Sequence, residues 1–432
     1  MAFQQGLSGL SVSSKALDVI GNNVANSSTV GFKSAQAHFA DVYAKSLGGG
    51  GASQVGIGSS VAAIQQQFTQ GNITTTNNPL DIAINGNGFF RMDSNGSITY
   101  SRNGQFHLDN AGYIINDQGA KLTGYGVDAN GMIIAANPSA IQLSSSAIPP
   151  LATGASVGGS FQGVLADVTL NSSEAEPADP WVAGPASGLA TIGATTYNYS
   201  TPVSVYDSLG NAHNLTLYFV KTANTGEWDV HANVDGTTDA RVTITGGPLQ
   251  FNTSGALDPA SADIGISIDL NGVMSDLGGV NNAASPLAFN IDFTGSTQYG
   301  TDSVVNSLKQ DGYTAGSLTG VSVGANGIIS GNFSNGQSRN LGQVVLANFS
   351  NPNGLTSLGN NQWAATSTAG EVVLGTPDSG GFGVLQALAI EESNVDLTSE
   401  LVSMITAQRN YQANAQTIKT QDQVMQTLVN LR

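Results

Sequence analysis

The last 37 residues form the sequence feature that most constrains how this chain can fold. The segment from Asp396 to Arg432 contains neither Gly nor Pro, and apolar residues recur in it at alternating spacings of four and three. These positions are Leu397, Leu401, Met404, Tyr411, Ala415, Ile418, Met425 and Val429, and the polar residues Gln408 and Asp422 complete the repeat. A heptad pattern of this kind predicts a helix whose apolar stripe packs against another helix.

The first residues of the chain carry a similar apolar stripe. It consists of Phe3, Leu7, Leu10, Leu17 and Val24, and it is interrupted by Ser14 and Gly21. All 13 prolines lie between Pro79 and Pro377, so both ends lack the residue that most strongly disrupts helices. We therefore predict a first helix from about Phe3 to Asn26 and a second over the last residues, joined in a coiled-coil domain. Because a stripe needs a partner, we expect the apolar positions of both helices to form a subunit interface.

The polar positions beside the C-terminal stripe are mostly uncharged. Typical coiled coils place Glu and Lys there, whereas this chain has Gln412, Asn414, Gln416 and Gln423. We expect these four side chains to lie between helices or to face a neutral, water-filled channel. A helix pair that is satisfied within one soluble chain is the alternative.

The overall charge limits the classes of partner. Charged residues make up 10% of the chain, and the formal net charge is −17. That balance argues against nucleic acid and anionic membrane surfaces as partners, although a solvated surface accounts for it equally well.

The chain has no Cys, so disulfides, thiol nucleophiles and thiolate metal sites are excluded. No apolar run has the roughly 18 residues of a membrane helix, and the first residues do not resemble a secretory signal peptide. Export would need another route.

The middle of the chain reads as mainly β. Short strand-like runs with a period of two are separated by Asn-Gly pairs, which favour tight hairpin turns. We expect one β domain over residues 79–150 and 293–384, and a second, outer β domain over 151–292 inserted into the first. Residues 31–78, with Gly48–Gly51, and residues 385–393 are expected to be extended linkers. The terminal helical domain would comprise residues 1–30 and 394–432.

Two glycine-rich motifs resemble catalytic or cofactor sites. Gly320–Gly324 matches the pattern around a nucleophilic serine, but its context predicts strand-turn-strand, and no His follows Ser322 as that fold requires. Gly124–Ala129 matches a relaxed dinucleotide fingerprint, yet it opens no predicted helix. Both are better explained as turns.

Two acidic turns resemble the start of a calcium loop. Asp93–Gly96 and Asp128–Gly131 lack the Glu at the twelfth position, where Gly104 and Ser139 stand instead. The four histidines, at positions 38, 107, 213 and 231, lack metal-ligand spacing. The sequence thus predicts no enzyme activity, no metal and no cofactor.

Several motifs resemble the flagellar rod and hook axial protein family. At the N-terminal end these are Leu17–Asn26 and Val30–Lys33, and in the first β domain Pro79–Phe90 and Tyr100–Phe106. Ser393–Leu397 and Ala407–Ala415 are similar to the C-terminal helix of the family. Within the family, the inserted middle domain and the segment Asp292–Gly300 favour the hook type over the shorter rod proteins.

The resemblance implies a subunit of a flexible helical tube that transmits motor torque to the filament and encloses an export channel. Its partners would be copies of itself, the distal rod, the hook cap, the hook-filament junction proteins and the flagellar type III export apparatus. The location would be extracellular, without a cleaved signal peptide. A distal rod subunit is the nearest alternative, and a secreted β-rich adhesin or hydrolase is an alternative of another class.

Overall fold

A computed structural model describes residues 2–42, 56–128, 131–143, 147–155 and 161–430. The chain divides into two compact units. Unit 1 comprises Met1–Ser145, Gly320–Asn332 and Ser338–Arg432, and unit 2 comprises Ser146–Thr319 and Phe333–Gln337. The fold is mainly β with a helix near each end, which confirms the predicted fold class.

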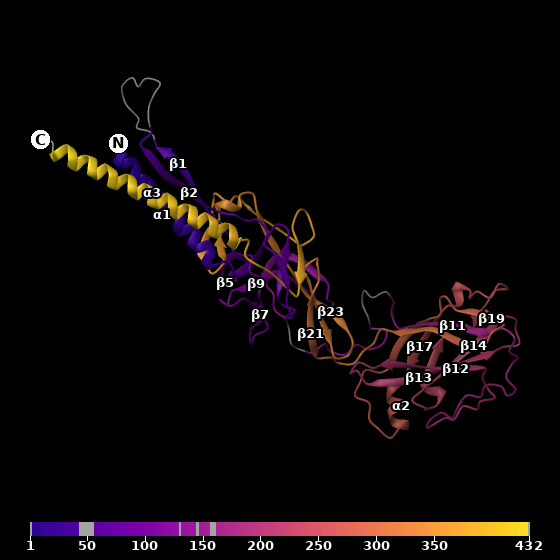
Figure 1. The fold of residues 1–432 in the computed structure, drawn as a ribbon. Helices are drawn as coiled ribbons and strands as arrows, with labels where there is room; N and C mark the ends of the chain where they lie inside the picture. The colour runs from indigo at the N-terminus through magenta and orange to yellow at the C-terminus, as the bar shows by residue number, and fades with distance from the viewer. Residues whose placement is uncertain (1, 43–55, 129–130, 144–146, 156–160, 431–432) are drawn as a thin grey trace. The chain divides into compact units, whose positions relative to one another are not determined.

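The two terminal helices belong to unit 1. Helix α1 runs from Ala2 to Ala25 and α3 from Leu397 to Asn430. They lie side by side and antiparallel, since Gly6 on α1 adjoins Ile418 on α3 while Asn23 donates to Glu400 (Figure 1). The carboxylate of Asp396 accepts hydrogen bonds from the first backbone N–H groups of α3, and this N-cap fixes where the helix begins.

The two segments expected to be linkers contain paired strands instead. Strands β1 (Ala35–Val42) and β2 (Gly58–Gln66) form an antiparallel pair along α1. Strand β3 (Ile73–Thr75) pairs with β29 (Ala389–Glu391), and β4 (Ile82–Asn85) pairs with β28 (Val384–Ala387). The partners of β3 and β4 lie some three hundred residues away in the sequence, so local sequence patterns could not show them. The Gly48–Gly51 run lies outside the described residues.

A large antiparallel sheet forms the body of unit 1. Its main strand order is β21-β22-β23-β9-β5-β6-β26-β25, with β10, β24, β27, β7 and β8 paired to its sides. The strands are β5 (Phe89–Ser94), β6 (Ser97–Ser101), β7 (His107–Leu108), β8 (Ile114–Ile115), β9 (Lys121–Val127), β10 (Ile133–Ala140), β21 (Leu318–Val323), β22 (Ile328–Phe333), β23 (Ser338–Val344), β24 (Leu346–Phe349), β25 (Thr356–Gly359), β26 (Gln362–Ala364) and β27 (Val372–Gly375).

Some of the Asn-Gly pairs form the predicted hairpin turns, and others do not. Asn95 and Gly96 both have positive φ between β5 and β6, as the predicted tight turn requires. Gly104 instead lies against the carbonyl of Ile82, where a Cβ would overlap that oxygen. It is therefore a point of close backbone approach rather than a hairpin turn.

Unit 2 is built from two sheets that share one core. One sheet has the order β15-β17-β18-β11-β19 with β20 also paired to β11, and the other has the order β12-β13-β14-β16. The strands are β11 (Val164–Asn171), β12 (Tyr199–Tyr206), β13 (Ala212–Lys221), β14 (Glu227–Val234), β15 (Val242–Thr245), β16 (Leu249–Gln250), β17 (Asp263–Ile268), β18 (Leu287–Asp292), β19 (Thr297–Tyr299) and β20 (Val304–Gln310). The short helix α2 (Leu270–Asp276) contributes Leu270 and Val273 to the core, beside Trp228 and Phe293.

Unit 2 extends further along the chain than the expected 151–292. Strands β19 and β20 both pair with β11 near the start of the unit. Isolated antiparallel bridges pair the first segment of the unit with its last, joining Ile148 to Gly316 and Leu151 to Tyr313. Because these segments complete a sheet of unit 2, they belong to it rather than to the first β domain.

A buried histidine lies between two carboxylates in unit 2. The Nδ1 atom of His213 is 2.7 Å from Oδ2 of Asp235, and its Nε2 atom is 3.6 Å from Oδ2 of Asp207. The hydrogen bond that Asp235 accepts from the imidazole raises the pKa of His213, and the charges of Asp235 and Asp207 add to this effect against the opposing effect of burial.

This histidine makes the stability of unit 2 depend on pH. Because the folded-state pKa is raised, protonated His213 stabilises the fold below its ordinary pKa of about 6.5, and this stabilisation is lost as pH rises through the folded-state pKa. We expect the calorimetric unfolding temperature of unit 2 to fall over that rise in the native chain. His213→Gln should flatten this dependence, whereas His38→Gln, at an exposed position of unit 1, should preserve it. An equal slope in native and H213Q protein would contradict the assignment.

Candidate assembly surface

The two terminal helices meet through small and polar residues. A Cβ on Gly6 would lie 3.0 Å from the Ile418 side chain, and one on Gly9 would lie 2.8 Å from that of Asn414. Ser13 is buried, and its hydroxyl lies 3.4 Å from Nδ2 of Asn414. Small residues spaced three or four apart along α1 therefore allow the helices to approach closely.

The contact between α1 and α3 does not bury the predicted apolar stripe. None of its thirteen positions is fully buried in the single chain. Leu10, Leu17, Val24, Met404, Ala415 and Ile418 are half-buried, whereas Phe3, Leu7, Leu397, Leu401, Tyr411, Met425 and Val429 are exposed. The contact with α1 involves Ile418 from the stripe, and most of the other large side chains on α3 point to solvent.

Further exposed apolar residues enlarge this surface. On α3 they are Val402, Ile405 and Val424, which lie outside the heptad positions. On the neighbouring β1-β2 pair, Phe39 and Val61 are opposite each other and both exposed, as is Ile64. A soluble monomer rarely exposes so many large apolar side chains on one group of elements, so this surface has the character of a protein interface.

The four uncharged polar residues divide into two groups. Asn414 faces α1, where its side chain adjoins Gly9 and Ser13. Gln412, Gln416 and Gln423 are exposed, and the helical repeat of 3.6 residues places them on one side of α3, away from α1. The structure thus makes Asn414 an inter-helix residue and leaves three glutamines on a continuous polar face.

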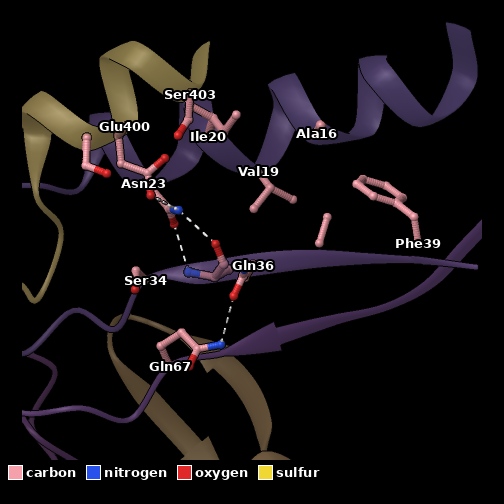
Figure 2. A pocket seen from close by; sticks show the side chains of 13 residues that line it. Ala16, Val19, Ile20, Asn23, Ser34, Gln36, Phe39, Gln67, Glu400 and Ser403 are labelled. Carbon is pink, nitrogen blue, oxygen red and sulfur yellow. Dashed lines mark hydrogen bonds between the residues drawn. The ribbon is translucent and has the colours of Figure 1, made fainter. Parts of the chain in front are cut away.

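A pocket lies where α1, β1 and the first turns of α3 come together (Figure 2). It has a volume of about 360 Å³. Apolar side chains lining it include Val19, Ile20 and Phe39, and polar ones include Asn23 and Glu400. The Nδ2 of Asn23 donates to Glu400 and to the Ala35 carbonyl, so the groups at its floor are already hydrogen-bonded.

A buried ion cluster attaches the helical part of unit 1 to its β sheet. The carboxylate of Glu391 on β29 lies 2.6 Å from the Lys33 ammonium and 3.2 Å from the Arg102 guanidinium. It also accepts a hydrogen bond from the backbone N–H of Gly71, and the Glu391 carbonyl accepts one from that of Gly31. The Glu391 and Lys33 side chains are both 0% exposed.

Burial dominates the electrostatics of this cluster. It lowers the pKa of Lys33 and of Arg102, and the charge and hydrogen bonds of Glu391 oppose that shift. Lys33 also donates to the Thr69 carbonyl, and Arg102 donates to the Gly86 carbonyl. One carboxylate therefore compensates two cations from distant parts of the chain.

Sequence patterns did not reveal Lys33, Arg102 and Glu391 as a cluster, although all three lie in or beside motifs that were noted. They are separated by up to 358 residues, and the strand pairings of β3 and β4 and the hydrogen bond from the Gly31 N–H to the Glu391 carbonyl bring them together. Gly6, Gly9 and Ser13 were also missed. Their spacing on one side of the first helix is a signal that could have identified them.

Four models of known protein families together match most of the chain. Residues 3–33 match the flagella basal body rod protein model, and residues 386–431 match the C-terminal model of flagellar basal body rod FlgEFG proteins. Residues 83–160 match the D1 domain of flagellar hook protein FlgE/F/G, and residues 169–313 match the D2 domain of flagellar basal body protein FlaE. Both helical ends and both units thus carry features of the flagellar rod and hook class.

Relatives that match over the full length are hook proteins rather than rod proteins. The chain is 44% identical to flagellar hook protein FlgE of Escherichia coli (strain K12) and 43% identical to that of Salmonella typhimurium, with 100% of each chain covered. A crystal structure of Helicobacter pylori flagellar hook protein FlgE2 is 14% identical, with a TM-score of 0.49 over 72% of this chain and 99% of that one. The chain belongs to the flagellar hook protein FlgE family, which confirms the resemblance seen in the sequence.

Membrane insertion through a helix finds no support in the described residues. None of the helices there combines the length and the apolar character needed to cross a bilayer.

Removing the charge of Glu391 should destabilise unit 1. In Glu391→Gln, Lys33 and Arg102 would remain buried without a counter-ion, and breaking a buried pair in this way costs about 3–5 kcal/mol. We expect a lower denaturation midpoint for unit 1, measured by the fluorescence of Trp363, whose side chain is buried in that unit.

The neighbouring residue supplies a matched control. Glu392 is exposed, so Glu392→Gln should change stability by no more than about 0.5 kcal/mol. Equal midpoints for the E391Q and E392Q proteins would show that the cluster does not stabilise unit 1.

Proposed function

We propose that this chain is a structural subunit of the bacterial flagellar hook, which self-assembles into a flexible helical tube and has no catalytic role. The observation that carries the proposal is the exposed apolar stripe on both terminal helices, in a chain that matches hook proteins along its full length. The tube would act as a universal joint that transmits motor torque to the filament.

The terminal helices would form the inner layer of the tube. The stripe residues left exposed, among them Leu7, Leu401 and Tyr411, would be buried by neighbouring copies. A head-to-tail contact that does not close into a ring generates a helical filament. The polar face of Gln412, Gln416 and Gln423 would line the channel, where uncharged side chains bind a passing polypeptide weakly whatever its charge.

The proposed partners follow from this role. They are copies of the same chain, the distal rod, the hook cap, the hook-filament junction proteins and the flagellar type III export apparatus. The subunit would be extracellular in the flagellum, and it would be exported without a cleaved signal peptide. The match of residues 169–313 to a D2 domain and the full-length similarity to hook proteins favour the hook over a distal rod subunit.

Substitutions in the exposed stripe should weaken assembly without unfolding the chain. Burial of a large apolar side chain contributes roughly 1.5–3 kcal/mol, and each 1.4 kcal/mol is tenfold in affinity. We therefore expect Leu401→Gln to raise the protein concentration needed for tubes by about tenfold or more, as measured by sedimentation and electron microscopy under salting-out conditions.

A polar position on the same helix serves as the control. Thr420→Ala changes an exposed residue outside the stripe, and it should polymerise at the native concentration. Normal assembly of the L401Q protein would place the main contacts elsewhere. Globular particles from the native chain under all conditions would argue against a polymer subunit.

Charge on the polar face should affect transport rather than assembly. We expect the triple variant Gln412→Glu, Gln416→Glu and Gln423→Glu to form tubes but to slow the export of filament protein in cells, since a charged wall attracts or repels segments of the passing chain. Export at the native rate through hooks of native length would contradict a channel-lining role for these residues.

A further inference from the structure

The C-terminal end of α3 projects beyond its partner helix. Gly6 lies opposite Ile418 and the helices are antiparallel, so the start of α1 at Ala2 falls opposite about residue 422, because both helices rise 1.5 Å per residue. In Figure 1 the yellow end of α3 accordingly continues past the indigo start of α1. We call residues 423–430 the tip of α3.

The tip carries large apolar side chains that are largely exposed in the described part of the chain. Val424, Met425 and Val429 are 48%, 57% and 71% exposed. Residues 423–430 include no charged residue. Such a segment gains by burial against the apolar side chains of another surface, and its burial leaves no unpaired charge behind.

The pocket between α1, β1 and α3 lies toward the other end of the same helix pair. Glu400 in the pocket and Met425 on the tip are 25 residues apart on α3, or about 38 Å along its axis. One chain therefore has a projecting apolar end at one place and an open groove at another, and its own tip cannot reach its own groove.

We infer that the pocket lined by Val19, Ile20 and Phe39 receives the α3 tip of a second copy of this chain. This inference rests on the proposed function and identifies one contact within it. The pocket volume of about 360 Å³ gives room for several apolar side chains, and Phe39, which is 43% exposed, forms its open edge. Glu400 is the only charged side chain among those lining the pocket, and it already accepts a hydrogen bond from Asn23.

The geometry of the two sites selects a second copy as the occupant. Each chain presents one tip and one pocket on different surfaces, so the contact is head-to-tail and every added copy offers a new tip or pocket. Every internal subunit then uses both its tip and its pocket, and only the two end copies keep one site free. An unrelated partner would fill one site and leave the complementary one exposed.

The absence of cysteine from the chain allows a direct test. In the double variant Met425→Cys and Phe39→Cys, oxidation of assembled tubes should link successive copies, since a disulfide needs Cα atoms within about 7 Å. We expect a ladder of covalent multimers on a non-reducing gel, and each single variant should give no species larger than a dimer.

A matched pair controls for non-specific oxidation. Leu358 is exposed on β25 of the same unit and does not line the pocket. Met425→Cys with Leu358→Cys should give at most a faint ladder. Tubes without a ladder from the 425–39 pair, or an equal ladder from the 425–358 pair, would overturn the contact while leaving the proposed function intact. A native chain that never polymerises would contradict both the contact and the proposed function.

A second measurement covers the case in which the cysteines disturb assembly. Val424→Asn with Met425→Asn alters only exposed side chains and should leave the thermal unfolding of the chain unchanged while reducing tube formation at least tenfold. Thr427→Ala, at an exposed position of the same helix turn, should assemble normally. Native assembly of the V424N/M425N protein would overturn the inference.

Discussion

One buried carboxylate holds unit 1 together. Glu391 binds Lys33 from the segment after α1 and Arg102 from the end of the β5-β6 hairpin, and it also accepts the Gly71 backbone N–H. In water such pairs contribute little, but here both cations are desolvated, and besides the carbonyls of Thr69 and Gly86 they share the charge of this one carboxylate. Together with the hydrogen bonds of Asn23 to Ala35 and of Asn394 to Ser34 and Gln67, this cluster joins the helix pair to the strands of unit 1.

The two terminal helices use different residues for the contact within the chain and for the apolar surface that is left for other contacts. Contact within the chain uses Gly6, Gly9 and Ser13 on α1 against Asn414 and Ile418 on α3. Because these residues are mostly small or polar, the large apolar residues remain on adjacent faces. The chain thereby keeps a well-defined helix pair while retaining apolar surface for other contacts. The β1-β2 pair extends that surface with Phe39 and Ile64.

Local sequence patterns predicted the elements that depend on local physics. The terminal helices follow from uninterrupted heptads and the lack of Pro, and the β5-β6 turn follows from the positive φ that Asn95-Gly96 tolerates. The motifs of the family added the class of protein, which comparison with full-length relatives confirmed.

What escaped prediction depends on residues that are distant in sequence. The strands β3 and β28, and the cluster around Glu391, have no local signature, because each is stabilised by a partner hundreds of residues away. The heptad also identified the stripe without showing which neighbour would cover it. Its residues are surface in the single chain, and the small residues beside them make the internal contact.

The discontinuity of unit 1 has a consequence for the order of events in time. Unit 2 is formed almost entirely from the continuous segment Ser146–Thr319, so its core can close once that segment is available. Unit 1 must wait, since β3 and β4 pair with β29 and β28, and α1 packs against α3 as well as against the nearby β1-β2 pair. Such distant pairings make closure slow. For a chain that emerges N-terminus first, the helix pair and the surface that carries both apolar stripes would therefore form last, after the core of unit 2 has closed.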